Sequence, residues 1–274
     1  MTFLADQHVH SDLSGDCSVP MREMARAAVK KGVDCLCFTD HCDLEDYQTG
    51  AYDPDCFDGA VRREAYENAL FSVGGDIEIL LGLELGESAH RPEKTAEILA
   101  CGGFDLIIGS IHNLRGDVDF YTRHSRNLFI SKEQCMKLLE RYVKEHLELA
   151  RFGGFDVIAH IGYPLRYMKD AGFDLTLDGF RDEFAEIFRL LAGSGRGIEV
   201  NTAGVRRGMG EVAPSPELIR LFRDCGGQIV TIGSDAHTRE DIAADFSWGV
   251  DALKDAGFTH YTVFRGRKPE FYEL

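Results

Sequence analysis

Short apolar runs recur along the chain and alternate with longer segments of amphipathic character. The runs have the length of β-strands and are far too short to span a membrane. They predict eight strands, at Phe3–His10, Val33–Thr39, Ile77–Leu85, Asp105–Ile111, Asp156–Ile161, Gly197–Asn201, Gln228–Gly233 and Tyr261–Phe264.

Helix signals separate these runs. Pro20 begins an amphipathic stretch that stops at Gly32, which is the usual placement of proline at the start and glycine at the end of a helix. Ser131 and Gln134 have the spacing of a capping box, which predicts a helix that starts there. A further helix is predicted to open at Pro216.

The regular alternation of strand and helix predicts a parallel α/β sheet, either open or closed into a barrel. A barrel is favoured because the alternation runs from end to end and because no Gly-x-Gly-x-x-Gly motif follows the first strand. No Pro/Ser-rich run marks a linker, so we predict a single domain over residues 1–274. Barrel enzymes carry their chemistry at the carboxyl ends of the strands, which directs the search for functional residues.

Charge and cysteine content narrow the expected partners and location. The formal net charge is −16, from 46 acidic and 30 basic residues. Such a surface favours solubility and repels nucleic acid and anionic lipid, so neither nucleic acid nor a membrane is an expected partner. The chain has eight cysteines and opens without a secretory signal, so we expect reduced thiols and a cytoplasmic location. No apolar stripe indicates an oligomer interface, and the oligomeric state stays open.

Ionisable side chains gather where the predicted strands end. His8 and His10 lie two apart on the first strand, so both imidazoles can point toward one ion. Other strands end in a histidine or an aspartate, and the third strand carries a glutamate in an otherwise apolar run. The set consists of His8, His10, His41, Glu84, His112, His160, Asp235 and His237.

A metal cluster is the favoured interpretation of this set. A single histidine at a strand end usually has a structural role. Burying so many ionisable groups together without ions, however, would carry a large desolvation penalty for each of them. We therefore predict two or three divalent metal ions. The remaining histidines lack this placement and are predicted to be surface or structural residues: His90, His124, His146 and His260.

In their order along essentially the whole chain, these motifs resemble the polymerase and histidinol phosphatase (PHP) superfamily. The resemblance rests on His8-Val-His10, Thr39-Asp-His41, Glu84, His112, His160 and Gly233-Ser-Asp-Ala-His237. Within the superfamily, residues 109–112, 119–121, 199–207 and 232–237 look most like the monofunctional histidinol-phosphate phosphatases.

The resemblance implies a distorted parallel (β/α)7 barrel around a trinuclear site for zinc, manganese or iron. The implied ligands are His8, His10, Glu84 and Asp235 for one ion, Glu84, His112 and His160 for a second, and His41, His237 and Asp16 for a third. Asp16 stands where many members have a histidine, and this harder ligand would favour manganese or iron over zinc. The eighth predicted strand is then either an edge strand outside the barrel or an error.

The implied activity is hydrolysis of a phosphate monoester, most closely L-histidinol phosphate of histidine biosynthesis. Metal ions lower the pKa of a bound water, so attack by hydroxide needs no covalent intermediate. Glu84, Asp235 and His237 are the expected catalytic residues, with Asp40 expected to orient a ligand. Arginines at the same rim are expected to bind phosphate. The substrate-binding candidates are Arg166, Arg206 and Arg207, the weaker Arg115 and Tyr121, and Glu199 and Asn201 for a substrate amine.

Three alternatives remain open at the level of the sequence. A phosphoesterase of the same superfamily could act on another small phosphate ester or on a nucleotide end. A metal-dependent amidohydrolase is more distant, because such barrels typically use a modified lysine as the bridging ligand and no strand here ends in lysine. A non-catalytic metal-binding protein is disfavoured by the complete ligand set.

Overall fold

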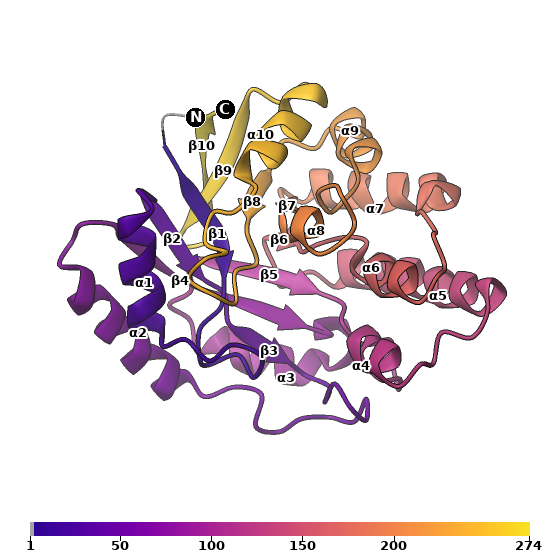
Figure 1. Ribbon diagram of the computed structural model, residues 1–274, viewed down its shortest axis with the longest axis horizontal. Helices are drawn as coiled ribbons and strands as arrows, with labels where there is room; N and C mark the ends of the chain where they lie inside the picture. The colour runs from indigo at the N-terminus through magenta and orange to yellow at the C-terminus, as the bar shows by residue number, and fades with distance from the viewer. Residues whose placement is uncertain (1–2) are drawn as a thin grey trace.

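A curved sheet of parallel strands forms the centre of the computed structural model, which describes residues 3–274 (Figure 1). Its strand order is β1-β2-β4-β5-β6-β7-β8, with the short β3 beside β4. The strands are β1 Ala5–Val9, β2 Cys35–Phe38, β3 His41–Asp43, β4 Glu78–Gly86, β5 Leu106–Ser110, β6 Val157–Ile158, β7 Gly197–Asn201 and β8 Val230–Gly233.

The two edges of this sheet meet at the carboxyl ends of β1 and β8. The backbone N–H of Asp235 donates to the carbonyl of His8 at 2.8 Å, and the N–H of His10 donates to the carbonyl of Ala236 at 3.0 Å. These bonds curl the sheet into a nearly closed barrel, which confirms the predicted parallel α/β barrel. They also bring the first and last histidine motifs of the chain together.

The short strand β3 is a feature that the apolar pattern of the sequence does not predict. β2 pairs with the first half of β4, and after Thr39 and Asp40 the chain pairs again with the second half of β4 as β3. In this register His41 lies opposite Glu84. The predicted second strand, Val33–Thr39, therefore corresponds to β2 alone, and β3 is a further short strand that follows it and distorts the barrel.

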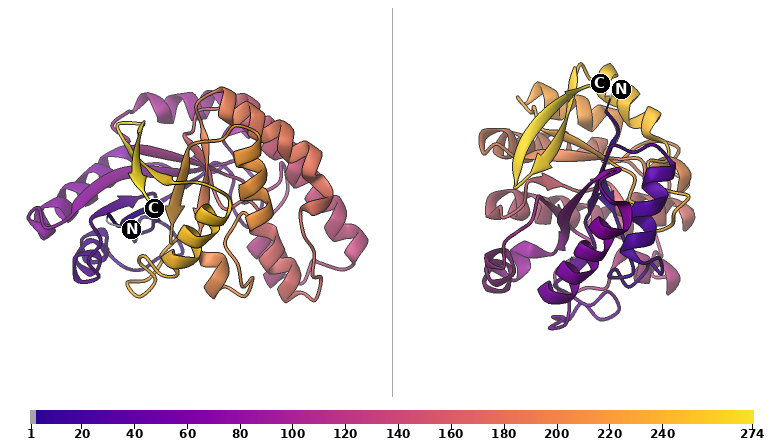
Figure 2. Two further views of the ribbon diagram at one scale, coloured as in Figure 1. Left: turned by 90° about the horizontal axis from the view of Figure 1, so that it is seen from above. Right: turned by 90° about the vertical axis from the view of Figure 1, so that its left-hand side faces the viewer.

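Helices cover the outside of the sheet (Figures 1 and 2). The longer helices are α1 Met21–Lys30, α2 Gly59–Val73, α3 Pro92–Ala100, α5 Lys132–Phe152, α7 Arg181–Gly193, α9 Pro216–Asp224 and α10 Phe246–Asp255. Short helices follow several strand ends, namely η1 Ser88–His90, α4 Phe120–Ser125, α6 Tyr163–Asp170 and α8 Ala203–Arg206, with η2 Asp178–Phe180 before α7. Within residues 3–274, no helix has both the length and the apolar character needed to cross a bilayer.

The predicted helix starts are confirmed. α1 begins directly after Pro20, and α9 begins at Pro216. At the start of α5 the N–H of Gln134 donates to the hydroxyl of Ser131 at 3.1 Å, as a capping residue requires. Gly32 has a positive φ of 71°, a conformation that glycine adopts without strain and that ends α1.

The eighth predicted strand lies outside the barrel. It is β9 His260–Arg265, which forms an antiparallel hairpin with β10 Lys268–Glu273. The hydroxyl of Tyr261 donates to the carbonyl of Phe3, and the N–H of Phe264 donates to the side chain of Gln7. The hairpin thus packs beside β1, where the open end of the barrel would otherwise expose strand edges.

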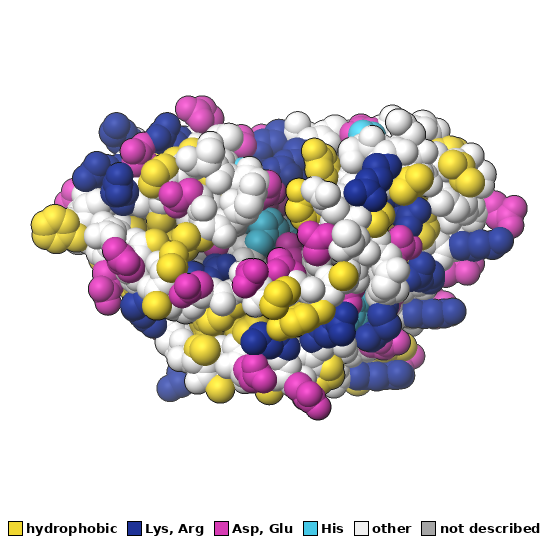
Figure 3. All heavy atoms as spheres, turned by 90° about the horizontal axis from the view of Figure 1, so that it is seen from below, with side chains coloured by type: hydrophobic (Ala, Val, Ile, Leu, Met, Phe, Trp, Pro, Cys, Tyr) yellow, Lys and Arg dark blue, Asp and Glu magenta, His cyan; other side chains and the backbone are white. Residues whose placement is uncertain are grey.

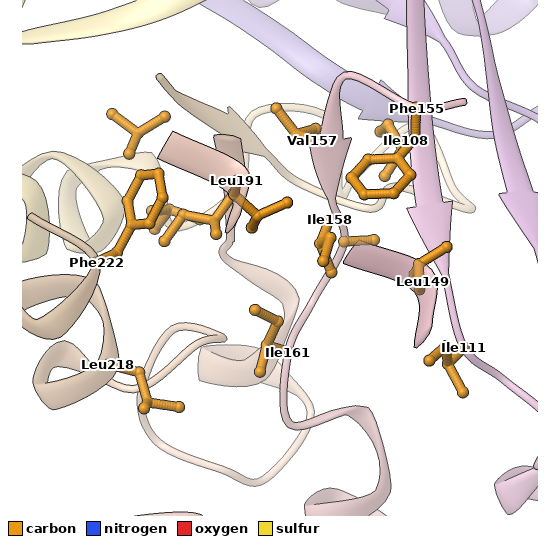
Figure 4. Close-up of a cluster of buried hydrophobic side chains, with 14 of the residues drawn as sticks. Ile108, Ile111, Leu149, Phe155, Val157, Ile158, Ile161, Leu191, Leu218 and Phe222 are labelled. Carbon is orange, nitrogen blue, oxygen red and sulfur yellow. The ribbon is translucent and has the colours of Figure 1, made fainter. Parts of the chain in front are cut away.

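A continuous apolar core fills the space between the strands and the outer helices. Each fully buried large aliphatic or aromatic side chain stabilises the fold by about 1.5–3 kcal/mol. The core therefore holds the strand ends, and the polar residues on them, in fixed positions. Figure 4 shows the part of this core to which β5, β6, α5, α7 and α9 contribute side chains. The side chains labelled there include Ile108, Leu149, Val157, Ile158, Leu191 and Phe222.

Candidate metal centre

Four residues from three strand ends form the first group of possible ligands. Nε2 of His8 lies 3.0 Å from Nε2 of His10. Oε2 of Glu84 lies 3.3 Å from the same atom of His8 and 3.5 Å from that of His10. Asp235, at the end of β8, places Oδ1 3.3 Å from Nε2 of His10. His8, His10 and Asp235 offer donors within 4.8 Å of one another, and Glu84 adjoins the two histidines, so the structure brings together the four residues that the resemblance grouped.

The other oxygen of Glu84 faces a second group. Oε1 of Glu84 lies 2.8 Å from Nε2 of His160 and 3.2 Å from Nε2 of His112. The two imidazole nitrogens are 3.4 Å apart. Glu84 therefore stands between two sets of donors, in the position of a bridging carboxylate.

A third group lies toward solvent. Oδ2 of Asp16 lies 3.0 Å from Nε2 of His237, and Oδ1 lies 3.8 Å from Nε2 of His41. The ring of His10 stacks on that of His237 with 4.1 Å between the centroids, and its centroid lies 4.4 Å from that of the tilted ring of His41. The structure thus brings Asp16 to both histidines with which the resemblance grouped it, although it lies on an exposed loop.

Asp43 is a site residue that the sequence analysis missed. Its Oδ1 lies 3.0 Å from Nδ1 of His112, and its Oδ2 lies 3.7 Å from Nδ1 of His41. Asp43 and His41 lie two apart on β3 and so share a face. The signal was present in His41-Cys-Asp43, but it is visible only when β3 is recognised as a strand.

The electrostatics of Glu84 fit a site for cations. Burial opposes ionisation, but His41, His8 and His112 hold the pKa of this carboxyl well below its usual value. Glu84 is therefore an ionised group with 0% exposure. Ser110 donates a hydrogen bond to Oε1 at 2.6 Å and fixes the side chain.

The histidine nitrogens also fit metal ligands. Nδ1 of His41 and Nε2 of His237 are buried and each lies 3.0 Å from a carboxylate oxygen, without the angles of a hydrogen bond. Burial and the neighbouring His237 and His41 lower the pKa of His10 well below its usual value, which keeps its ring neutral and able to ligate an ion. Several triads of donors lie within 4.8 Å of one another, among them His8, Glu84 and His160.

Glu199 contacts His8, a member of the first group, at the ring nitrogen that does not face the other donors. Its Oε1 lies 2.6 Å from Nδ1 of His8, and its Oε2 accepts hydrogen bonds from the N–H of His160 and the amide of Asn201. Glu199 and Asn201 are 0% and 1% exposed. The Glu199 carboxylate is thus directed at His8 rather than at open space, in contrast to the predicted contact with a substrate amine.

Asp40 has a similar supporting place. Its carboxylate accepts hydrogen bonds from the N–H and hydroxyl of Ser11 and from the hydroxyl of Ser14. The hydroxyl of Ser14 lies 2.9 Å from Nδ1 of His10. Asp40 therefore holds the side chain of His10 through Ser14, whose hydroxyl also accepts a hydrogen bond from the backbone N–H of His41 at 3.0 Å.

Two further buried carboxyl groups fix the loops that carry ligands. Asp6 accepts hydrogen bonds from the N–H and hydroxyl of Ser234 and from the N–H of Ala243, and so holds the loop of Asp235. Burial raises the pKa of Asp6. Glu87 accepts a 2.7 Å hydrogen bond from the N–H of His112. The alternation of β1 places Asp6 on the same face as His8, a signal that the sequence analysis did not use.

Most of these donors line a cavity of about 850 Å³, whereas His8, His10 and Glu84 are fully buried and lie outside its lining. Figure 3 shows a histidine within a hollow that acidic side chains surround. Tyrosines and two arginines form the walls, with Tyr121 at an exposed position. The lining includes Asp16, His41, Asp43, Tyr47, His112, Asp119, Tyr121, His160, Tyr163, Arg166, Tyr167, Arg207, Asp235 and His237.

The two arginines of the cavity differ in how they are held. Arg166, on α6, packs its guanidinium over the rings of Tyr163 and Tyr167, 4.6 and 4.5 Å from their centroids. Its Nε is buried without a hydrogen-bond partner. Arg207 follows α8 and places Nη2 3.4 Å from Nδ1 of His237. Both therefore present donors beside the candidate ligands, where the sequence analysis expected them.

The other two predicted arginines lie elsewhere. Arg206 forms an ion pair with Asp241 at 3.2 Å and donates to the carbonyl of Ser234. Arg115 pairs with Glu148 at 3.0 Å on the protein surface. The structure places neither of them in the cavity lining, because each guanidinium turns toward a partner outside it.

The four remaining histidines are also outside this lining within the described part of the chain. His146 is buried and contacts the carbonyl of Tyr142 at 2.9 Å. His90 lies between the carboxylates of Glu45 and Glu145. Both are structural, as predicted.

A smaller cavity of about 230 Å³ adjoins the metal cavity and shares His160, Tyr163, Arg166 and Asp235 with it. The rest of its lining consists largely of apolar side chains and also includes three carboxylates. The apolar residues include Leu165, Leu175, Leu177, Val212 and Leu218, and the carboxylates are Asp178, Glu211 and Glu217.

A nearly closed parallel barrel with buried imidazole and carboxylate donors at its strand ends defines a metal-binding α/β barrel with room for more than one ion. The chain belongs to the PHP domain family, whose model matches residues 6–203. The resemblance seen in the sequence is therefore confirmed.

Relatives are similar over nearly their whole length. A probable histidinol-phosphatase of Deinococcus radiodurans is 29% identical, over 98% of this chain and 99% of the relative. A histidinol-phosphatase of Lactococcus lactis subsp. lactis is 26% identical, over 96% and 95%. The crystal structure of histidinol phosphate phosphatase from that organism, in complex with zinc, L-histidinol and phosphate, is 22% identical, with a TM-score of 0.78 over 97% of this chain and 98% of the other.

Proposed function

We propose that this protein is a metal-dependent phosphatase that hydrolyses L-histidinol phosphate to L-histidinol and phosphate. The observation that carries the proposal is the place of Glu84, whose two oxygens each face a separate set of buried imidazoles. The full-length similarity to histidinol-phosphatases supports the choice of substrate.

The three groups of candidate ligands fit divalent metal ions. His8, His10, Glu84 and Asp235 would hold one ion, Glu84, His112 and His160 a second, and His41, His237 and Asp16 a third. Mixed imidazole and carboxylate donors suit zinc, manganese or iron. Such ions, when bound, supply charge neutralisation at the phosphoryl group and activation of a water molecule.

Arg166 and Arg207 would bind the phosphoryl oxygens. The planar guanidinium offers paired donors that match two oxygens of a phosphate. Arg166 is held in place before any substrate arrives, because its guanidinium lies over two tyrosine rings. A fixed donor loses little conformational entropy on binding, so it contributes to affinity and to orientation.

The smaller cavity would receive the alcohol part of the ester. The smaller cavity includes His160, Arg166 and Asp235, which also line the larger one. An ester whose phosphoryl group lies at the candidate metal ligands can therefore place its alcohol part in the smaller cavity. Apolar walls and three carboxylates suit a compact group that carries a positive charge. L-histidinol, with an ammonium group and an imidazole ring, has this character.

A bridging lysine, as in many metal-dependent amidohydrolases, has no counterpart here. Glu84 lies between the donor groups, and among the described residues of the cavity lining there is no lysine. The site geometry therefore favours a phosphoesterase over that alternative.

The test is phosphate release from L-histidinol phosphate beside a panel of small monoesters and nucleotides. The protein is first stripped with a chelator and then loaded with manganese or zinc, and the stripped protein is the control. A strong preference for L-histidinol phosphate supports the proposal. Broad weak activity, or activity on nucleotides alone, would leave a metal-dependent phosphatase and remove the histidinol phosphate assignment.

A further inference from the structure

Two cysteine side chains lie together next to the metal cavity. The sulfur atoms of Cys42 and Cys56 are 3.9 Å apart, with the thiol of Cys42 donating to Cys56. Cys42 is fully buried in β3, whereas Cys56 is partly exposed in the loop before α2. The described cysteines are all unbonded thiols. A reagent in solution can therefore reach the thiol of Cys56, and the buried thiol of Cys42 lies beside Cys56 and can then react with it.

The position of Cys42 links this pair to the site. It lies between His41 and Asp43, which both line the cavity. Because successive side chains of a strand point to opposite faces, Cys42 points away from the cavity. Any displacement of Cys42 along that direction moves both of its neighbours relative to Glu84, against which His41 is paired.

The segment between the two cysteines forms part of the cavity wall. Tyr47, within it, lines the cavity. The N–H of Asp119 donates to the carbonyl of Tyr47 at 3.0 Å, and the amide of Asn113 donates to the carbonyl of Asp46 at 3.2 Å. A change in this segment therefore reaches the loop that follows His112.

We propose that Cys42 and Cys56 form a reversible disulfide under oxidising conditions and that this bond disables the metal cavity. A disulfide requires the sulfurs at about 2.05 Å. Closing the gap from 3.9 Å draws β3 and the 44–56 segment together. His41, Asp43 and Tyr47 shift with them, and a misplacement of about 1 Å at such a site lowers activity on the order of 100-fold.

The oxidant is a small disulfide, such as oxidised glutathione. The thiolate of Cys56 attacks one sulfur of the oxidant, which forms a mixed disulfide and releases one reduced thiolate. The thiol of Cys42 then attacks the Cys56 sulfur, which forms the Cys42–Cys56 bond and releases the second half of the oxidant as a thiol that carries the Cys42 proton. Two cysteine thiols are oxidised and one disulfide is reduced to two thiols. The hydrogen bond from Cys42 lowers the pKa of the Cys56 thiol, which favours the first step.

The experiment treats the metal-loaded protein with oxidised glutathione, blocks the remaining thiols and maps cross-linked peptides by mass spectrometry. We expect a Cys42–Cys56 cross-link, the loss of two of the eight titratable thiols, and a fall of about tenfold or more in hydrolysis of an aryl phosphate. Reduced glutathione should restore the thiols and the activity. Cys56→Ser should form no cross-link and keep its activity, whereas Cys101→Ser, which removes an exposed thiol, should respond like the parent.

Absence of the Cys42–Cys56 cross-link in the parent protein would overturn the proposal. So would a cross-linked protein that keeps its activity and its metal content. Peptide mapping and metal analysis need no substrate, so both readouts stand even if the proposed phosphatase function fails. Should Cys56→Ser not fold, Cys56→Ala serves as the second variant.

Discussion

The carboxylate of Glu199 lies 2.6 Å from Nδ1 of His8, and both side chains are fully buried. The two residues are 191 positions apart and meet because the barrel closes. Glu199 thereby holds the His8 proton on Nδ1 and leaves Nε2 directed at the other donors.

Glu199→Gln should therefore act on metal binding. Loss of a carboxylate that orients a ligand lowers metal affinity by about 10–100-fold, and activity should fall to match at limiting metal. The measurement is activity against metal concentration, together with metal content after dialysis. Glu217→Gln, at the rim of the smaller cavity, is the control that should keep the metal. A higher KM for the ester with unchanged metal affinity would instead support the amine-binding role expected from the sequence.

Most of the candidate ligands could be located from the sequence because they lie at or near strand ends, whereas Asp16 lies on a loop and came only from the resemblance. His8, His112 and His160 follow apolar runs that are strands in the structure, and carboxyl ends of parallel strands share one edge. Asp43 was not predictable in this way, because β3 has three residues and follows polar Thr39 and Asp40. Its pairing with β4 depends on the full barrel rather than on local propensity.

The orientation of the arginines could not be predicted either. Arg206 and Arg207 are adjacent, and the sequence gives no reason to separate them. At the end of the short helix α8, however, one guanidinium turns to Asp241 and the other to His237. This difference arises from contacts with a loop that lies 30 or more residues further along the chain, which no local pattern contains.

Arg166→Lys tests the proposed phosphate clamp. Lysine keeps the charge but loses the planar donor pair and the stacking on Tyr163 and Tyr167, so kcat/KM for every phosphate ester should fall about 10- to 100-fold. Steady-state kinetics and inhibition by inorganic phosphate measure the effect. Arg115→Lys, on the surface beside Glu148, is the matched control and should behave like the parent. Equal small losses in both variants would argue against a phosphate contact at Arg166.

Glu211→Gln tests the smaller cavity as the place of the alcohol group. Burial and the neighbouring Glu217 raise the pKa of Glu211, and the nearby Lys169 offsets this only in part. Loss of its charge should raise KM for L-histidinol phosphate about 10-fold and leave KM for a neutral aryl phosphate within about twofold, since a charged hydrogen bond contributes about 1.5–3 kcal/mol. Equal changes for both esters would place the alcohol group elsewhere, for example against the tyrosine wall of the larger cavity.

His90 should make stability depend on pH. Its Nε2 lies 2.9 Å from the carboxylate of Glu145 on α5, and its Nδ1 lies 3.3 Å from the carboxylate of Glu45 in the loop after β3. His90 therefore connects this loop to α5. Burial opposes protonation, but these carboxylates raise the pKa of His90 to about 9. Because this exceeds the unfolded value of about 6.5, the stabilisation is complete below that pH and is lost as pH rises toward 9.

The melting temperature should therefore fall from about pH 7 to pH 9.5, and His90→Gln should flatten this slope while lowering stability at pH 6.5 by a few kcal/mol. Thermal unfolding followed by circular dichroism at each pH provides the measurement. His260→Gln, at an exposed position of β9, is the control that should keep the parental slope. A parental slope in His90→Gln would show that other groups set the pH dependence.

Asp16→Ala tests whether the outermost donor group holds an ion of its own. Asp16 has a side chain that is 60% exposed on a loop, so its removal should leave the fold intact. His41 and His237 alone offer only two donors, too few for a stable site, whereas the groups around Glu84 remain complete. The metal content measured after dialysis should therefore fall by about one ion per chain, while the ions that the groups around Glu84 would hold stay bound. Asp12→Ala, an exposed change in the same loop, should keep the full content. Loss of all metal in Asp16→Ala would mean that the groups form one interdependent cluster, and no loss would mean that Asp16 does not ligate an ion.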